Sequence, residues 1–380
     1  MTHPYFTHQY EYTCMLDGFL LFSVLDVWRV LLPLGLSIMC VGTLAFQRLV
    51  GETQNTGLSQ FLCLLTYRMT AFLVCILGVV GIAVPWVLGY SLPESHVAVG
   101  PWSYEEICGY VVGLVLLWQL EQQVRQHQIP SGLMLAGVMI LFLGAAFLWI
   151  GRWDAMANAG QVPGGWVMGS SVQWEWSRLI PKSFHLLFSA LVAGGMVVAG
   201  LGLFGTLTFR SDHGSIDSDS VKSSPDLIRY GVGWMLSGLV PQMLIGPWLF
   251  LLLQDRPQMA LIEGTSLTSL IFFVSLTTAL FALVLLNASF MVPHVKGLVW
   301  GGLGNVAMTL ALMGIVRYET FGATLYSHNI PFAMAELSGW HVLSVVVLVA
   351  LLGALLVRWC VWPSTLIFHS TLPTPHLDKT

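Results

Sequence analysis

The chain has 380 residues, of which 56% are hydrophobic and 9% are charged, with a formal net charge of -4. A mean hydropathy of +0.77 excludes a soluble globular domain and is typical of a polytopic membrane protein. The sequence contains no basic cluster, which argues against nucleic acid as a partner.

Apolar segments long enough to cross a bilayer follow one another along the chain. A helix needs about 20 apolar residues to span the hydrocarbon core, and polar stretches separate such segments here. The sequence therefore predicts an all-α integral membrane protein, a bundle of about nine transmembrane helices. The predicted spans lie near residues 24–48, 61–90, 103–122, 130–150, 180–208, 227–254, 264–290, 296–318 and 338–362.

The ends of the chain and its basic residues predict an orientation. Before the first span there is neither a basic region nor a small-residue cleavage site, so we expect no cleavable signal peptide. Basic residues favour the cytoplasmic side, and a weak bias between alternate loops places the N-terminus outside and the C-terminus inside. The predicted inner side carries Arg48, Arg125, Arg210, Lys222, Lys296, Arg358 and Lys379, and the outer side carries Arg152, Arg178, Lys182, Arg256 and Arg317.

Two connections differ from the others. Residues 151–179 are rich in glycine and tryptophan and suit an interfacial lid. Residues 210–226 are rich in serine and aspartate and suit a flexible inner linker. Because neither is long enough for a second domain, we expect one membrane domain that comprises residues 1–380. Five helices lie in residues 1–209, the inner linker follows, four helices lie in residues 227–362, and residues 363–380 form a C-terminal tail.

The six cysteines are scattered, mostly inside the predicted spans. They form neither a CxxC pair nor a CxxCH attachment motif. Covalently attached c-type haem, a zinc site and an iron–sulfur cluster are therefore not expected.

The apolar run from Ile180 to Phe209 carries one histidine, His185, about one turn inside its first end. Ionisable residues inside membrane spans are rare and often functional. Small residues such as Ala190 and Gly194 follow on the next turns, where they let a flat ligand or another helix come close. Two interpretations stay open: a haem ligand, or a histidine that hydrogen-bonds a buried carbonyl.

Several landmarks together resemble subunit I of the cytochrome bd quinol oxidases. The most specific is the His185 helix, in which small residues and a glycine nine positions later, Gly194, are similar to the haem-b helix of that family. The resemblance extends over nearly the whole chain. Its other landmarks are Val30–Leu36, Glu105 or Glu106, Trp149-Ile150, Asn158, Gln161–Pro163, Arg229 and Gln258–Gly264.

The chain also departs from that family at its oxygen-reducing site. Trp28 stands where the family has the histidine of its oxygen-reducing haem, and an indole cannot ligate iron. The segment Ala311–Ile315 lacks the glutamate expected for the second high-spin haem, and the quinol loop shrinks to residues 254–265. The resemblance therefore implies at most one haem b, held at its iron by His185, and no oxygen reduction.

A second axial ligand would have to come from another helix at a similar depth. His341 is a candidate by depth, and Met243 is a candidate because a thioether can complete Met/His ligation. Met243 lies about 15 Å from the outer end of its span, whereas His185 lies about one turn inside its own. The cofactor-binding residues that we expect are therefore His185, His341 and Met243, and no catalytic residue is indicated.

The resemblance implies a membrane subunit of a respiratory complex in the bacterial inner membrane. It would pass electrons between the quinone pool and a redox protein on the outer face through one haem b. Its partners would be other membrane subunits, that redox protein and quinone, and whether it is itself an enzyme stays open. Two alternatives are a haem-free structural anchor of such a complex and, ranked last, a transporter. Pro241-Gln242 and Gly246-Pro247 hint at a broken span, but no symmetric counterpart appears.

Overall fold

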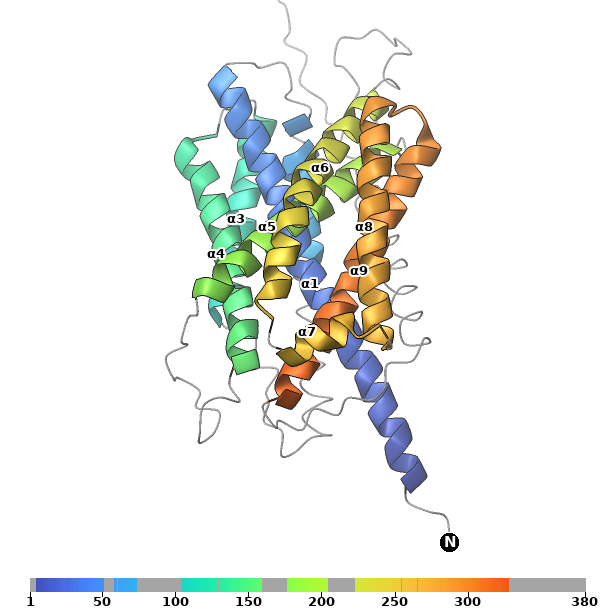
Figure 1. The fold of residues 1–380 in the computed structure, drawn as a ribbon. Coiled ribbons are helices and arrows are strands. Elements are labelled where there is room, and N and C mark those ends of the chain that lie inside the picture. The colour runs from blue at the N-terminus through green and yellow to red at the C-terminus, as the bar shows by residue number, and fades with distance from the viewer. Residues whose placement is uncertain are drawn as a thin grey trace, which may run out of the picture.

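The computed structural model describes the backbone of residues 5–50, 58–59, 61–73, 104–126, 128, 130–158, 176–203, 223–253, 255–264 and 266–327. Every regular element in these ranges is a helix, in agreement with the predicted all-α class. The helices are α1 (Tyr5–Val50), a helix at Phe61–Leu73, α3 (Tyr104–Arg125), α4 (Gly132–Asn158), α5 (Trp176–Leu203), α6 (Ser223–Leu251), α7 (Asp255–Ile262), α8 (Leu267–Met291) and α9 (Lys296–Ser327) (Figure 1).

Six of the described helices are long and apolar enough to cross a membrane. Their spans are Val27–Leu49, Gly132–Gly151, Trp176–Leu203, Pro225–Leu251, Leu267–Met291 and Lys296–Arg317. They agree with six predicted spans and support a membrane protein. Of the other three, the span 103–122 corresponds to α3, which is helical but is not among the six, and the span 61–90 is described only as the shorter apolar helix Phe61–Leu73. The span 338–362 lies outside the described residues. The number nine stays a prediction.

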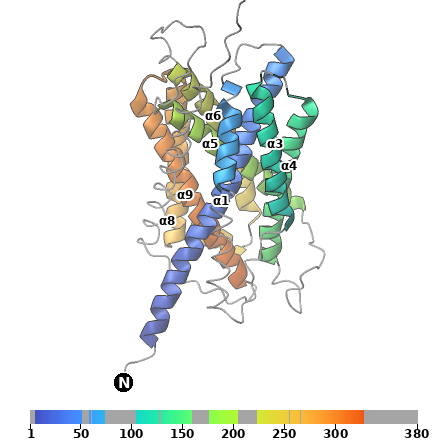
Figure 2. The same ribbon diagram turned by 180° about the vertical axis from the view of Figure 1, so that it is seen from behind.

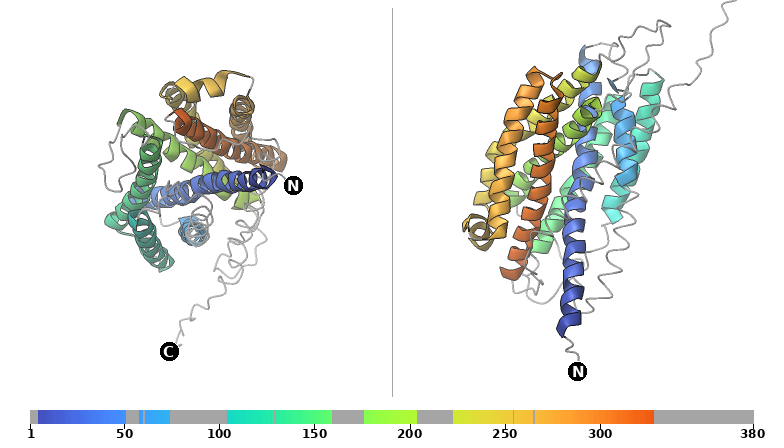
Figure 3. Two further views of the ribbon diagram at one scale, coloured as in Figure 1. Left: turned by 90° about the horizontal axis from the view of Figure 1, so that it is seen from below. Right: turned by 90° about the vertical axis from the view of Figure 1, so that its right-hand side faces the viewer.

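The outer surface of the bundle is apolar, as a lipid-facing surface requires. On α6 and α8, for example, Leu244 is 79% exposed and Val284 is 65% exposed. α1 continues beyond its apolar part and projects from the bundle at the N-terminal end (Figures 1 and 2). The end-on view in Figure 3 shows α1 crossing the middle of the bundle.

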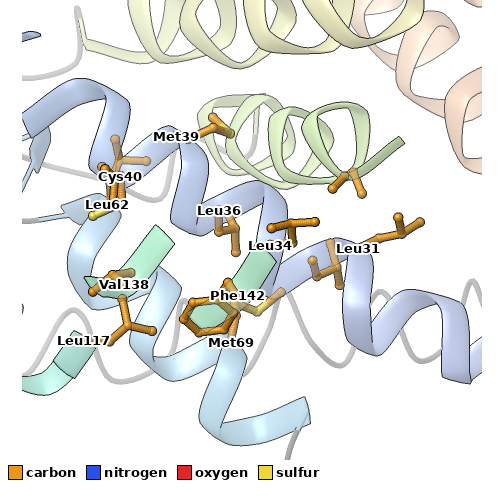
Figure 4. Packing of buried hydrophobic residues seen from close by; sticks show 14 of the residues in the cluster. Leu31, Leu34, Leu36, Met39, Cys40, Leu62, Met69, Leu117, Val138 and Phe142 are labelled. Atoms are coloured by element: carbon orange, nitrogen blue, oxygen red, sulfur yellow. The ribbon is translucent and has the colours of Figure 1, made fainter. Parts of the chain in front are cut away.

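Two apolar cores fill the bundle, and α5 contributes to both. The first lies among α1, the Phe61–Leu73 helix, α3, α4 and α5, together with Leu227 of α6. Figure 4 shows part of it, with Phe142 of α4 beside Met69. The second lies among α5, α6, α8 and α9, and Leu310 of α9 packs against both cores. α5 therefore joins the two groups of helices.

Small residues hold α5 directly against the backbones of its two neighbours. A Cβ on Gly35 of α1 would collide with the Ala190 carbonyl of α5. On the other side, a Cβ on Gly195 would lie 2.5 Å from the Gly231 carbonyl of α6, and one on Gly238 would lie 2.5 Å from the Phe188 carbonyl. Such close approach is what small residues allow in membrane helices. At these turns of α5, neighbouring helices occupy the small-residue surface.

α6 is one continuous helix, although Pro241 and Pro247 lie inside it. The hint of a broken span at these prolines is therefore wrong. Proline removes one backbone donor, but a membrane helix tolerates it when neighbouring groups satisfy the freed carbonyl. α6 ends before the short helix α7, and Gly264 then takes a positive φ of 73° in the turn into α8. Ser266 caps α8 by accepting a hydrogen bond from the Ser269 amide.

Candidate functional site

His185 lies deeper in its helix than the apolar pattern suggests. α5 begins at Trp176, so nine residues, or about 14 Å at 1.5 Å per residue, separate the helix start from the histidine. The ring is partly buried in the bundle. An imidazole at this depth needs polar neighbours from the protein.

Gln242 of α6 is the main polar neighbour of His185. Its amide Nε2 donates to the His185 carbonyl at 2.6 Å and to the Ser189 hydroxyl at 2.8 Å. These two bonds join α5 to α6 one turn beyond the contact between Gly238 and Phe188. Interhelical hydrogen bonds of this kind fix the register of membrane helices.

Two buried atoms of this pair have no hydrogen-bond partner. They are Nδ1 of the His185 ring and Oε1 of the Gln242 amide. Buried polar atoms are almost always satisfied in folded proteins, so each such atom calls for an explanation. When Nδ1 carries the proton, it is a donor and Oε1 is the acceptor on the adjacent side chain. The other ring nitrogen, Nε2, is then left with its lone pair for a ligand.

Arg317 of α9 supplies positive charge at this end of the bundle. Its guanidinium carbon lies 4.1 Å from the centroid of the Trp149 ring of α4, a cation–π distance. α9, which carries Arg317, also packs against α5. Trp149, which belongs to the sequence landmarks, is 2% exposed. This end of the bundle therefore gathers side chains from α4, α5, α6 and α9.

Arg29 of α1 lies at a similar depth. α1 and α5 run in the same direction, and Gly35 packs against Ala190 and Gly194. Arg29 comes six residues before Gly35, which places it level with the turn that contains His185. Its side chain is 2% exposed. A buried arginine thus lies near the depth of the histidine, in addition to the half-buried Arg317.

The remaining predicted ligands are not brought to His185 by the described contacts. The stripe of α6 that faces α5 contains Gly231, Met235, Gly238 and Gln242. Met243 follows Gln242 on the next face of the helix and is partly exposed, so it stays a prediction. His341 lies outside the described residues.

The other landmarks are only partly described. Trp28 is half-buried against the first core, and Arg229 is exposed on α6. In the proposed lid, Trp176 stacks on Phe147 of α4 with ring centroids 6.1 Å apart. The side chains of Glu105, Glu106, Trp153 and Asn158, and all of residues 159–175 and 204–222, lie outside the described residues.

Sequence reasoning overlooked Arg29 and gave no role to Gln242 in contacting His185. Arg29 had a signal, because an arginine falls inside the predicted span 24–48. Gln242 also had one, since an amide next to Pro241 interrupts an apolar span. Their common depth with His185 depends on how the helices pack, which the sequence pattern does not reveal.

Comparison with known proteins adds no relative to this picture. No protein-family model matches the chain, and no curated protein matches it.

The described residues fit one axial ligand of a haem. A metal-ligating histidine usually donates its second ring N–H to an acceptor that fixes the ring, and Gln242, which bonds the His185 backbone carbonyl, has an Oε1 without another partner. Within the described residues, no group of three or more His, Cys, Asp or Glu could hold a metal ion. A haem differs from such a centre because the protein need provide only axial ligands. At Gly194 and Gly195, the backbones of α1 and α6 fill the small-residue turns and leave no room for a flat ligand there.

Proposed function

We propose that the protein is a haem-b membrane subunit of a respiratory complex. It passes electrons between the quinone pool and a redox protein on the outer face, and it does not reduce oxygen. The sequence resemblance to subunit I of the bd oxidases suggests this function. The structural observation that carries it is the pair of unsatisfied buried atoms on His185 and Gln242.

Each residue at this end of the bundle has a role in the proposal. His185 would hold the haem iron through Nε2, with Gln242 Oε1 accepting the Nδ1 proton and fixing the ring. Arg317 and Arg29 would supply positive charge for the haem propionates. The bound haem would supply one-electron transfer, at a potential set by its axial ligands and by the dielectric around it. His341 and Met243 are the proposed sources of a second ligand.

A second candidate function is a haem-free anchor for a respiratory complex. The observation that favours it is the tight packing of α5, whose glycines touch the backbones of α1 and α6. In this reading, the small residues below His185 serve helix association alone. His185 and Gln242 would then stabilise the bundle without binding a cofactor.

Quinol reduction distinguishes the two functions. The chain is purified with its native partner subunits, a short-chain quinol is added, and the visible spectrum is followed. We expect a b-type band that appears on reduction, is lost in His185→Ala, and persists in His294→Ala. His294 is a matched control because it is exposed in the turn between α8 and α9. A wild-type complex with no quinol-reducible band would favour the anchor.

A further inference from the structure

Two cysteines meet in the first core, away from His185. Cys40 of α1 and Cys63 of the Phe61–Leu73 helix are both free thiols and both 0% exposed. Their Sγ atoms lie 3.1 Å apart. Figure 4 shows Cys40 beside Leu62, at the point where the two helices touch. These sulfurs therefore face each other across a helix contact.

The surrounding contacts fix this geometry. One turn along the shorter helix, the Thr66 hydroxyl donates to the Leu62 carbonyl at 2.6 Å and lies 3.3 Å from the Leu36 carbonyl of α1. Leu36 and Leu62 are both 0% exposed. A disulfide has its sulfurs about 2.05 Å apart, so bond formation needs an approach of only about 1 Å.

We propose that Cys40 and Cys63 form a reversible disulfide between α1 and the Phe61–Leu73 helix. The oxidant must be small, because both thiols are 0% exposed, and hydrogen peroxide meets this requirement. One thiolate attacks a peroxide oxygen, the O–O bond breaks, and a sulfenic acid and a water result. The second thiol then attacks the sulfenic sulfur, the S–S bond forms, and a second water leaves. Two thiols and one peroxide thus become one disulfide and two waters.

The alternative is that the two cysteines are packing residues and nothing more. Free cysteine is among the most buried residue types and behaves as a small hydrophobe. Thiols that only pack would stay reduced under peroxide or would be oxidised one at a time. The two readings therefore differ in the product of oxidation. The proposal is independent of haem at His185, since the pair lies in another region of the bundle.

The test counts thiols in the full-length protein. In a variant with Cys14, Cys75, Cys108 and Cys360 changed to alanine, Cys40 and Cys63 are the only cysteines left. The protein is treated in detergent with peroxide or with a phosphine reductant, and it is then denatured and labelled with maleimide. The number of labels is read from the intact mass by mass spectrometry. We expect two labels after reduction, none after peroxide, and two again when the reductant follows peroxide. The product should be a single chain.

Further changes of Cys40 to alanine or Cys63 to alanine in this background provide the controls. Each of these variants has a single cysteine left, so peroxide should produce no disulfide within one chain. Two labels after peroxide, a cross-link between chains, or irreversible oxidation of separate cysteines would overturn the proposal. If the four-alanine variant does not fold, peptide mapping of the natural chain gives the same decision. A peptide pair joined through Cys40 and Cys63 supports the proposal, and its absence after peroxide overturns it.

Discussion

Gln242 shows how one amide links two membrane helices next to a partly buried histidine. Both of its donated hydrogen bonds go to α5, one to a backbone carbonyl and one to Ser189. Its oxygen has no partner, and neither has Nδ1 of His185. The same residue therefore serves helix packing and, in the proposed function, the orientation of an axial ligand.

Gln242→Ala should destabilise the protein by about 1–2 kcal/mol, because it removes two hydrogen bonds between α5 and α6. The measurement is unfolding in a mixed micelle with increasing denaturing detergent. Asn287→Ala is the control, since Asn287 is exposed and donates only to the Leu283 carbonyl of its own helix at 2.8 Å. Equal effects of the two changes would show that the contact between α5 and α6 contributes little.

At the scale of the helix, glycines set how closely α5 approaches α1 and α6. Gly35, Gly195 and Gly238 each face the backbone of a neighbouring helix at a distance that excludes a Cβ. Van der Waals packing between such close backbones is a main source of helix association in a bilayer. The depth of Gln242 relative to His185 follows from this register.

Gly238→Ala should destabilise the bundle by about 1–3 kcal/mol, because the new Cβ would meet the Phe188 carbonyl. Gly246→Ala in the same helix is the matched control, since nothing lies within 4 Å of its added Cβ. That control should be neutral or slightly stabilising, because alanine favours a helix more than glycine does. Detergent unfolding curves for the two variants check this. Similar losses in both would contradict the described register of α5 and α6.

The sequence predicted helices better than it predicted their neighbours. Six spans were predicted correctly because long apolar segments identify membrane helices directly. The predicted break in α6 was wrong. A proline in the sequence means that one backbone donor is missing, but it does not show whether the surrounding helices compensate for that loss. His185 was found because a histidine is rare inside an apolar span. Its contact with Gln242 depends on the register between α5 and α6, which hydropathy does not predict.

In the whole molecule, α5 lies where the two apolar cores meet. His185 lies nine residues inside this shared helix, and Arg29, Trp149, Gln242 and Arg317 belong to four other helices that pack around the same part of the bundle. A site of this kind is assembled only when both groups of helices pack against α5. Any haem would therefore depend on the intact bundle and, at its centre, on His185.

Counting haem in the purified protein shows whether His185 holds one. The pyridine haemochrome content per chain is compared for the natural protein, His185→Gln and His294→Gln, each with its native partner subunits. We expect about one haem b for the natural chain and for His294→Gln, after subtraction of haem held by the partners, and none for His185→Gln. A haem content that His185→Gln leaves unchanged, or a natural chain without haem, would contradict this expectation.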